Sequence, residues 1–173
     1  MSRFTNVLVV SPYPDGKTWY LRGDFGYDVG AEGSGRTIIV PEGFTTDFAS
    51  VPRPLWSIFP KWGKYGNAAV IHDYLYFVQL TTRKETDGIF LEAMGILNVS
   101  GWQKWPIYWG VRLFGFIAWY MNAGKKRLGY SKITSVAPLK ATDVPIHWKT
   151  RKGDLKRILF KRNANGKKHN DNG

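Results

Sequence analysis

The chain contains no cysteine, and only three of its 173 residues are histidine. Without cysteine, disulfides, thiolate catalysis and cysteine-bound zinc are excluded. The first residues contain no apolar run long enough for a signal peptide. We therefore expect the protein to stay in the cytoplasm of the cell that makes it, or to leave inside a larger assembly.

Acidic residues are also scarce, with 13 Asp+Glu against 25 Lys+Arg. Residues 1–124 are nearly balanced, with 11 basic and 10 acidic residues, whereas residues 125–173 hold 14 basic and three acidic ones. This asymmetry predicts a basic extension that binds phosphate on nucleic acid or an anionic membrane, although it is also typical of a solvated tail. The candidate binding residues are Lys125, Lys126, Arg127, Lys156, Arg157, Lys161 and Arg162.

Hydrophobic residues make up 43% of the chain and aromatic residues 16%, which is enough for a packed core. Short β-branched runs separated by turn residues predict an antiparallel sheet, and a Pro-Tyr-Pro-Asp-Gly turn at 12–16 predicts a hairpin. We expect an α+β fold, in which a small N-terminal antiparallel sheet packs against a three-helix layer. A single domain would span residues 1–124, followed by the basic extension 125–173 with a disordered end. The strands are expected at 4–10, 17–21, 25–29 and 36–41.

Three helices are expected at about 67–80, 83–97 and 105–122. Asn67 is a candidate cap for the first helix, and Thr82 followed by Glu85 forms a capping box before the second. The third run is aromatic on all sides, carries only Arg112 as a charge between Pro106 and Met121, and is shorter than the roughly 20 apolar residues that span a bilayer. We expect a core helix packed on several sides; the alternative is an interfacial segment with Trp and Tyr at the lipid headgroups.

The first helix carries an ionisable pair, His72 and Asp73, inside an apolar run. His72 and Tyr76 share one face because they are four residues apart, whereas Asp73 is rotated by about 100°. Asp87 lies on the apolar face of the second helix. If the two helices form an antiparallel hairpin, Asp87 lies across from His72 or Tyr76, although it could also only support the helix start.

Two loops before the first helix contain further candidates. Asp47 is expected to accept backbone N–H bonds in a turn, rather than to bind a ligand. Ser50 is expected to cap a helix that has Pro52 early in its first turn. The glycine-rich loop 62–67 can aim backbone carbonyls, such as those of Gly63 and Tyr65, at a cation, or it can simply turn.

These residues are compatible with three chemistries. His72 can take a proton from water while Asp87 orients the imidazole and Asp73 holds a cation that polarises an ester. Alternatively, His72 and Asp73 are metal ligands for phosphoester hydrolysis. In the third case nothing reacts, and the pair belongs to a satisfied buried network.

Two resemblances bear on this choice. The pattern GFTTDFASVPR at 43–53, which includes Arg53, then AAVIHDYLY at 68–76 and Arg83, Asp87, Phe90 and Met94 resembles a family of phage and prophage proteins known only as a domain of unknown function. This resemblance covers about residues 4–120 and implies a bacteriophage origin.

A more distant resemblance covers about residues 62–94. His72-Asp73-x-x-Tyr76, followed by an Asp on the next helix, is similar to the catalytic helix pair of phospholipase A-two enzymes. The resemblance implies that His72 is a general base, Asp87 orients it, and Tyr76 hydrogen-bonds Asp87. It further implies that Asp73 and the carbonyls of the 62–66 loop bind calcium.

We therefore expect a bacteriophage protein with a phospholipase-like site, which performs calcium-assisted ester hydrolysis at the host envelope. The alternative is a non-enzymatic virion component, such as a tail or connector protein, whose His-Asp network is structural and whose basic extension binds another virion protein or DNA. Either protein would be made in the host cytoplasm, with the virion as its second location.

Overall fold

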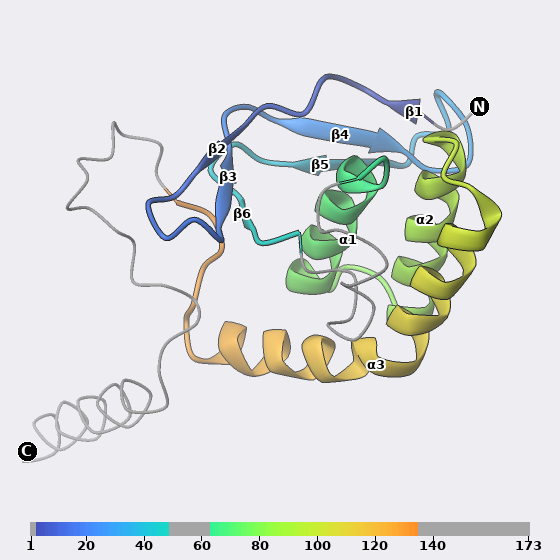
Figure 1. Ribbon diagram of the computed structural model, residues 1–173. Helices are drawn as coiled ribbons and strands as arrows, with labels where there is room; N and C mark the ends of the chain where they lie inside the picture. Colours follow the sequence, from blue (N-terminus) through green and yellow to red (C-terminus); the bar gives the residue numbers. More distant parts are fainter. Residues whose placement is uncertain (1–2, 49–62, 135–173) are drawn as a thin grey trace, which may run out of the picture.

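Short strands form the N-terminal part of the fold, and helices form the rest (Figure 1). The structure is a computed structural model that describes residues 3–48 and 63–134. Strands β1, β4 and β5 form one antiparallel sheet, and β2, β3 and β6 form another. The α+β fold is confirmed, with two small sheets in place of one. The elements are β1 Arg3–Phe4, β2 Val10–Pro12, β3 Trp19–Leu21, β4 Phe25–Asp28, β5 Thr37–Val40, β6 Thr45–Thr46, α1 Gly66–Val78, α2 Arg83–Ile96 and α3 Gly101–Arg127.

The predicted hairpin is present. β2 and β3 pair antiparallel, with Val10 opposite Leu21, around a turn in which Gly16 has φ +63°. The Asp15 carboxylate accepts the backbone N–H groups of Lys17 and Thr18, at 2.9 Å each, which closes the turn. The turn therefore forms from local chemistry that the sequence already contains.

The single first strand predicted at 4–10 is wrong. The run divides between β1 and β2, which belong to different sheets, and the residues between them form no strand. Val7 and Val9 in this connection are exposed, although their β-branched side chains favour strands. The connection leaves the first sheet at Thr5, whose N–H bonds to the Gly26 carbonyl.

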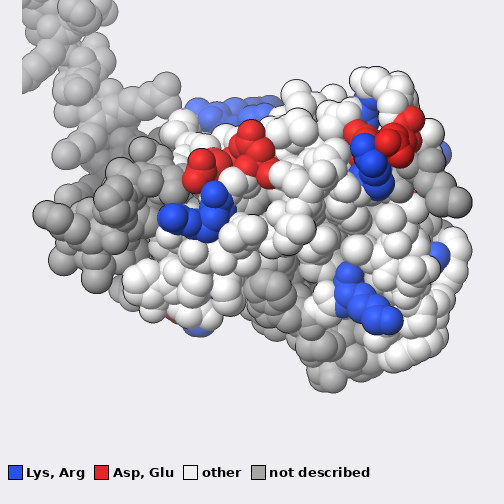
Figure 2. Space-filling model, turned by 90° about the horizontal axis from the view of Figure 1, so that it is seen from above, with Lys and Arg blue, Asp and Glu red and all other residues white. Residues whose placement is uncertain are grey.

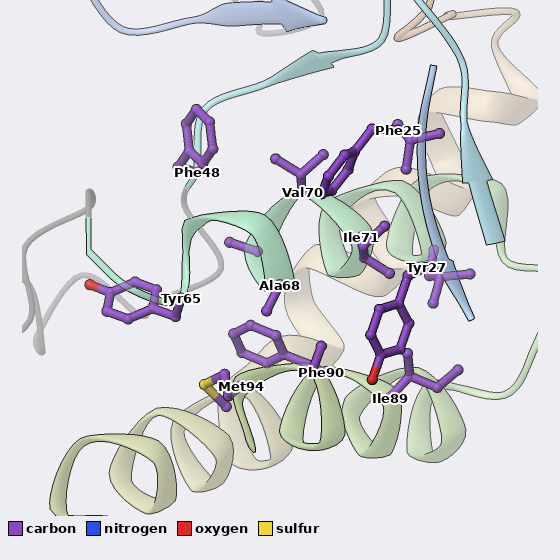
Figure 3. Packing of buried hydrophobic residues seen from close by; sticks show 14 of the residues in the cluster. Phe25, Tyr27, Phe48, Tyr65, Ala68, Val70, Ile71, Ile89, Phe90 and Met94 are labelled. Atoms are coloured by element: carbon purple, nitrogen blue, oxygen red, sulfur yellow. The ribbon is translucent and has the colours of Figure 1, made fainter. Parts of the chain in front are cut away.

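Helix α1 is the centre of the fold, and it packs against α2, α3 and both sheets. Its Val70 and Ile71 face Phe25 and Tyr27 of β4, and Phe90 of α2 lies on its other side (Figure 3). This explains why the α1 sequence is apolar nearly all round. The predicted cap at Asn67 is wrong, because α1 begins at Gly66, with Tyr65 in the cap position.

Helix α2 begins as predicted. The Thr82 hydroxyl accepts the backbone N–H of Glu85 at 3.2 Å and so caps the helix start. The connection from α1 is short, and the two helices pack side by side. This hairpin fixes which residues of α2 can face His72.

Helix α3 differs from its prediction in length and in burial. It begins at Gly101 and continues through Gly124, with Pro106 inside its second turn. Only Ile107, Gly110, Val111 and Asn122 are buried, so the predicted core helix is wrong. In Figure 1, α3 runs along the outside of the molecule, with α1 and both sheets to one side of it. Within the described ranges, no helix combines the length and apolar character needed to cross a bilayer.

The chain after α3 returns to the sheet. The Lys132 carbonyl accepts the N–H of Thr45 at 2.7 Å, and Thr134 donates to the Gly43 carbonyl at 2.9 Å. Residues 128–134 therefore hold β6 in place. The predicted disorder of the chain end lies outside the described residues.

Candidate functional site

The α1–α2 hairpin brings together the three residues that the sequence singled out. His72 Nε2 lies 3.1 Å from Asp87 Oδ1, and the Tyr76 hydroxyl donates to the same oxygen at 2.7 Å. His72 and Tyr76 reach one oxygen because they are one helical turn apart on the face of α1 that meets α2. The predicted contacts are present; the catalytic roles stay predictions.

The second oxygen of Asp87 binds two arginines. Arg112 Nη1 of α3 lies 2.6 Å from Asp87 Oδ2, and Arg83 Nη1 lies 3.3 Å from it. Arg83 also donates to the carbonyls of Val111 and Arg112, at 3.3 and 3.0 Å, and so ties α2 to α3. Asp87 itself has no exposed surface. One carboxylate thus accepts four donors that come from all three described helices.

This environment keeps Asp87 ionised. Burial alone would raise the pKa of Asp87, but the hydrogen bond and charge of His72, with the hydrogen bonds of Tyr76 and Arg112, outweigh burial and lower it. The hydrogen bond between Arg112 and Asp87 also raises the pKa of Arg112. At neutral pH the site therefore contains a carboxylate that only accepts hydrogen bonds.

The His72 ring is held on both sides. It stacks on Phe90, with 4.5 Å between ring centroids, and contacts the Tyr76 ring at 4.2 Å. His72 is 3% exposed. Because Asp87 can only accept, Nε2 carries the proton in the neutral ring, and the lone pair lies on Nδ1. A fixed tautomer is one requirement of a general base.

Tyr76 is a permanent donor within this site. Burial, together with the hydrogen bond to Asp87 and its charge, raises the pKa of Tyr76. Its ring meets the edge of Trp119 on α3, with 5.2 Å between centroids. A methyl group added at Gly115 would overlap the Tyr76 hydroxyl, so α3 approaches this close only because residue 115 is glycine.

Asp73 points to a different part of the fold, as its rotation from His72 predicted. Its Oδ2 accepts the Thr46 hydroxyl at 2.6 Å, and the same hydroxyl accepts the N–H of Phe48 at 3.1 Å. Phe48 has φ +50°, a left-handed conformation that is uncommon outside glycine. Asp47, between Thr46 and Phe48, is buried. Thr46 therefore links this turn to Asp73 of α1.

The predicted calcium ligands do not form a complete site among the described residues. The Gly63 and Tyr65 carbonyls accept the N–H groups of Gly66 and Ala69, at 3.0 and 2.9 Å. Calcium needs six to eight oxygen ligands. In the part of the chain that the structure describes, no three His, Asp or Glu residues gather as a metal-binding group. The calcium prediction therefore still depends on Asp73, whose Oδ2 accepts the Thr46 hydroxyl.

Other predicted residues are dispersed. Lys125, Lys126 and Arg127 form the last turn of α3, and Lys126 Nζ donates to the Val78 carbonyl at the end of α1 at 2.6 Å. This contact satisfies an open carbonyl of α1. The remaining predicted site residues lie outside the described ranges; they are Ser50, Arg53, Lys156, Arg157, Lys161 and Arg162.

The sequence prediction missed the roles of Arg83, Arg112 and Thr46. Arg83 precedes Asp87 by four residues, a spacing that pairs opposite charges on a helix. Arg112 is the single charge inside a long aromatic run, which is itself a signal that a buried partner exists. Nothing in the local sequence connects Thr46 with Asp73, because 27 residues separate them.

Comparison with known proteins places the chain among proteins without an established activity. It is 36% identical over 97 residues to the uncharacterized protein y4jT of Sinorhizobium fredii. That alignment covers 55% of this chain and only 28% of the relative. No solved structure matches the chain. A family model described as "Protein of unknown function (DUF1353)" matches residues 19–111, a span that contains His72, Asp73, Tyr76 and Asp87. Since this match covers more than half of the chain, the protein belongs to the DUF1353 family.

Proposed function

We propose that this protein hydrolyses a phospholipid ester, with His72 as the general base. One observation carries the proposal: Asp87 Oδ1 accepts hydrogen bonds from both His72 Nε2 and the Tyr76 hydroxyl across an antiparallel helix pair. The resemblance of His72-Asp73-x-x-Tyr76 to phospholipase A-two enzymes implies this arrangement. This resemblance supports the proposal. The family match does not contribute, because the family description names no activity.

The chemistry follows from the tautomer. His72 Nδ1 takes a proton from a water molecule, the hydroxide attacks the ester carbonyl, and the imidazolium returns the proton to the leaving alcohol. Asp87 stabilises the imidazolium and keeps the ring in place. Tyr76, Arg83 and Arg112 act on Asp87 and are therefore positioning residues. They hold the carboxylate ionised and fix its direction.

The setting of this activity is also a proposal. The sequence resemblance to phage proteins supports a bacteriophage origin, a virion or host-cytoplasm location, and action on the host envelope. Calcium, if it binds, would polarise the ester carbonyl beside Asp73. Calorimetric titration of calcium into the wild type and into Asp73→Asn tests this part, since binding through Asp73 requires that the variant loses it.

The test of hydrolysis uses the full chain and vesicles of phosphatidylglycerol and phosphatidylcholine, with release of fatty acid as the readout. His72→Ala should lower the rate by at least about 100-fold, which is the usual contribution of a general base. Asp28→Asn is a matched control, because Asp28 is a buried carboxylate whose hydrogen-bond partner is Thr37 in the sheet. Equal rates for the wild type and His72→Ala would refute the proposal.

A structural role for the same network is the second candidate. Asp87 joins all three described helices through four donors, which is also what a folding element requires. In this case the protein is a non-enzymatic virion component, such as a tail or connector protein. His72→Ala would then lower the melting temperature, and neither this variant nor the wild type would hydrolyse phospholipid. The wild type would co-purify with phage particles.

A further inference from the structure

Helix α3 presents an apolar stripe to solvent, on the side away from the core. The stripe consists of Trp102, Trp105, Trp109, Leu113, Phe116 and Tyr120. These side chains are 45–72% exposed. Successive members are three or four residues apart, so they line one face of the helix over about 27 Å. Such a long aromatic face is unusual on a protein surface and marks an interaction site.

The opposite face of α3 already has its partners. Ile107 and Val111 are buried in the core, Arg112 binds Asp87, and Asn122 donates to the Tyr76 carbonyl at 3.2 Å. The helix therefore has two apolar sides with different functions. The inner side packs on α1 and α2, and the stripe faces solvent.

The charge of α3 indicates which kind of partner can bind the stripe. The helix carries five basic residues, Lys104, Arg112, Lys125, Lys126 and Arg127, and no acidic one. In contrast, acidic and basic side chains lie together on the face seen in Figure 2. A second copy would bring two basic helices together. Residues 135–173, with ten Lys+Arg and three Asp, would also add like charge. Both occupants would be repelled.

We propose that the α3 stripe docks on an anionic lipid surface. Trp and Tyr favour the headgroup level, and a helix with an aromatic face and basic flanks lies in the plane of the interface. Such a helix lies on the bilayer and does not cross it, in agreement with its limited hydropathy. The basic end of α3, at Arg127, meets the anionic headgroups. This docking does not depend on hydrolysis at His72.

Docking through this face would also orient the candidate site. Trp119, next to the stripe, contacts Tyr76, and Arg112 binds Asp87 from the same helix. The network that holds His72 is thus one helix thickness from the proposed lipid surface.

The experiment measures binding of the full chain to vesicles of equal parts phosphatidylglycerol and phosphatidylcholine, by co-sedimentation and by the blue shift of Trp fluorescence. We compare the wild type, Trp102→Glu/Trp109→Glu and the control Val7→Glu/Leu80→Glu, which replaces two exposed apolar side chains elsewhere. The stripe variant, Trp102→Glu/Trp109→Glu, should bind at least about 100-fold more weakly, because each of the two inserted aromatic side chains contributes more than a tenfold step in affinity. The control should bind like the wild type.

Three outcomes would overturn the inference. The wild type could fail to bind these vesicles. The stripe variant and the control could bind alike with full loss in high salt, which would place the binding in basic residues alone. Finally, the wild type could be a dimer that the stripe variant converts to a monomer, with no vesicle binding, in which case a second copy is the occupant.

Discussion

Replacing Arg112 by Met should destabilise the protein far more than removing a surface arginine. Arg112 is one of four donors to a carboxylate with no exposed surface. Breaking a buried ion pair from one side costs about 3–5 kcal/mol, because the partner charge is left buried. Arg83 still binds the same oxygen, at 3.3 Å, so we expect the lower end, about 3 kcal/mol.

The control is Arg36→Met, since Arg36 also pairs with a carboxylate of α2, Glu85, but both side chains are exposed. An exposed pair contributes at most about 1 kcal/mol. Urea unfolding of both variants, followed by circular dichroism, gives the two free energies of unfolding. Equal losses for the two variants would refute the claim that the Asp87 network holds the helices together.

The same comparison has a pH dependence with a defined sign. The pKa of Asp87 is lowered in the folded protein, so its stabilisation is present above the ordinary value of 3.8 and is lost as the pH falls through the folded value. In Arg112→Met the pKa of Asp87 should rise. The difference in unfolding free energy between wild type and variant should therefore shrink below about pH 4. A difference that grows in acid would contradict the assignment.

Three further predictions concern packing, titration and capping. Gly115→Ala should destabilise by about 1–3 kcal/mol because its methyl group overlaps the Tyr76 hydroxyl. Gly124→Ala in the same helix, where the methyl group meets nothing, should gain up to about 1 kcal/mol, and thermal unfolding separates the two. Because the pKa of Tyr76 is raised in the folded protein, the stabilisation by Tyr76 is present below the ordinary value of 10.0 and is lost as the pH rises through the raised value. The difference in unfolding free energy between the wild type and Tyr76→Phe should therefore be smaller at alkaline pH, as measured by urea titrations. Thr82→Ala should cost about 1 kcal/mol through loss of the Glu85 N–H bond, with recovery by Thr82→Ser as the check.

Sequence alone determined the features that depend on neighbouring residues. The hairpin turn at Asp15-Gly16, the start of α2 at Thr82, and the shared face of His72 and Tyr76 each involve contacts within a few residues. Local chemistry fixes such features, so they can be read from the order of the side chains. The contact of Asp87 with His72 also followed, because a short connection forces α1 and α2 to lie side by side.

Tertiary structure decided everything that depends on which faces meet. Arg112 binds Asp87 across 25 residues, and Thr46 binds Asp73 across 27. In α3 the apolar pattern is present all round, so periodicity could not tell the buried face of Val111 from the exposed face of Trp109. The packing of α1 and α2 against one side of α3 made that choice. It turned Arg112 toward the buried Asp87 and left an aromatic stripe outside, because only one side of a helix can face the same neighbours.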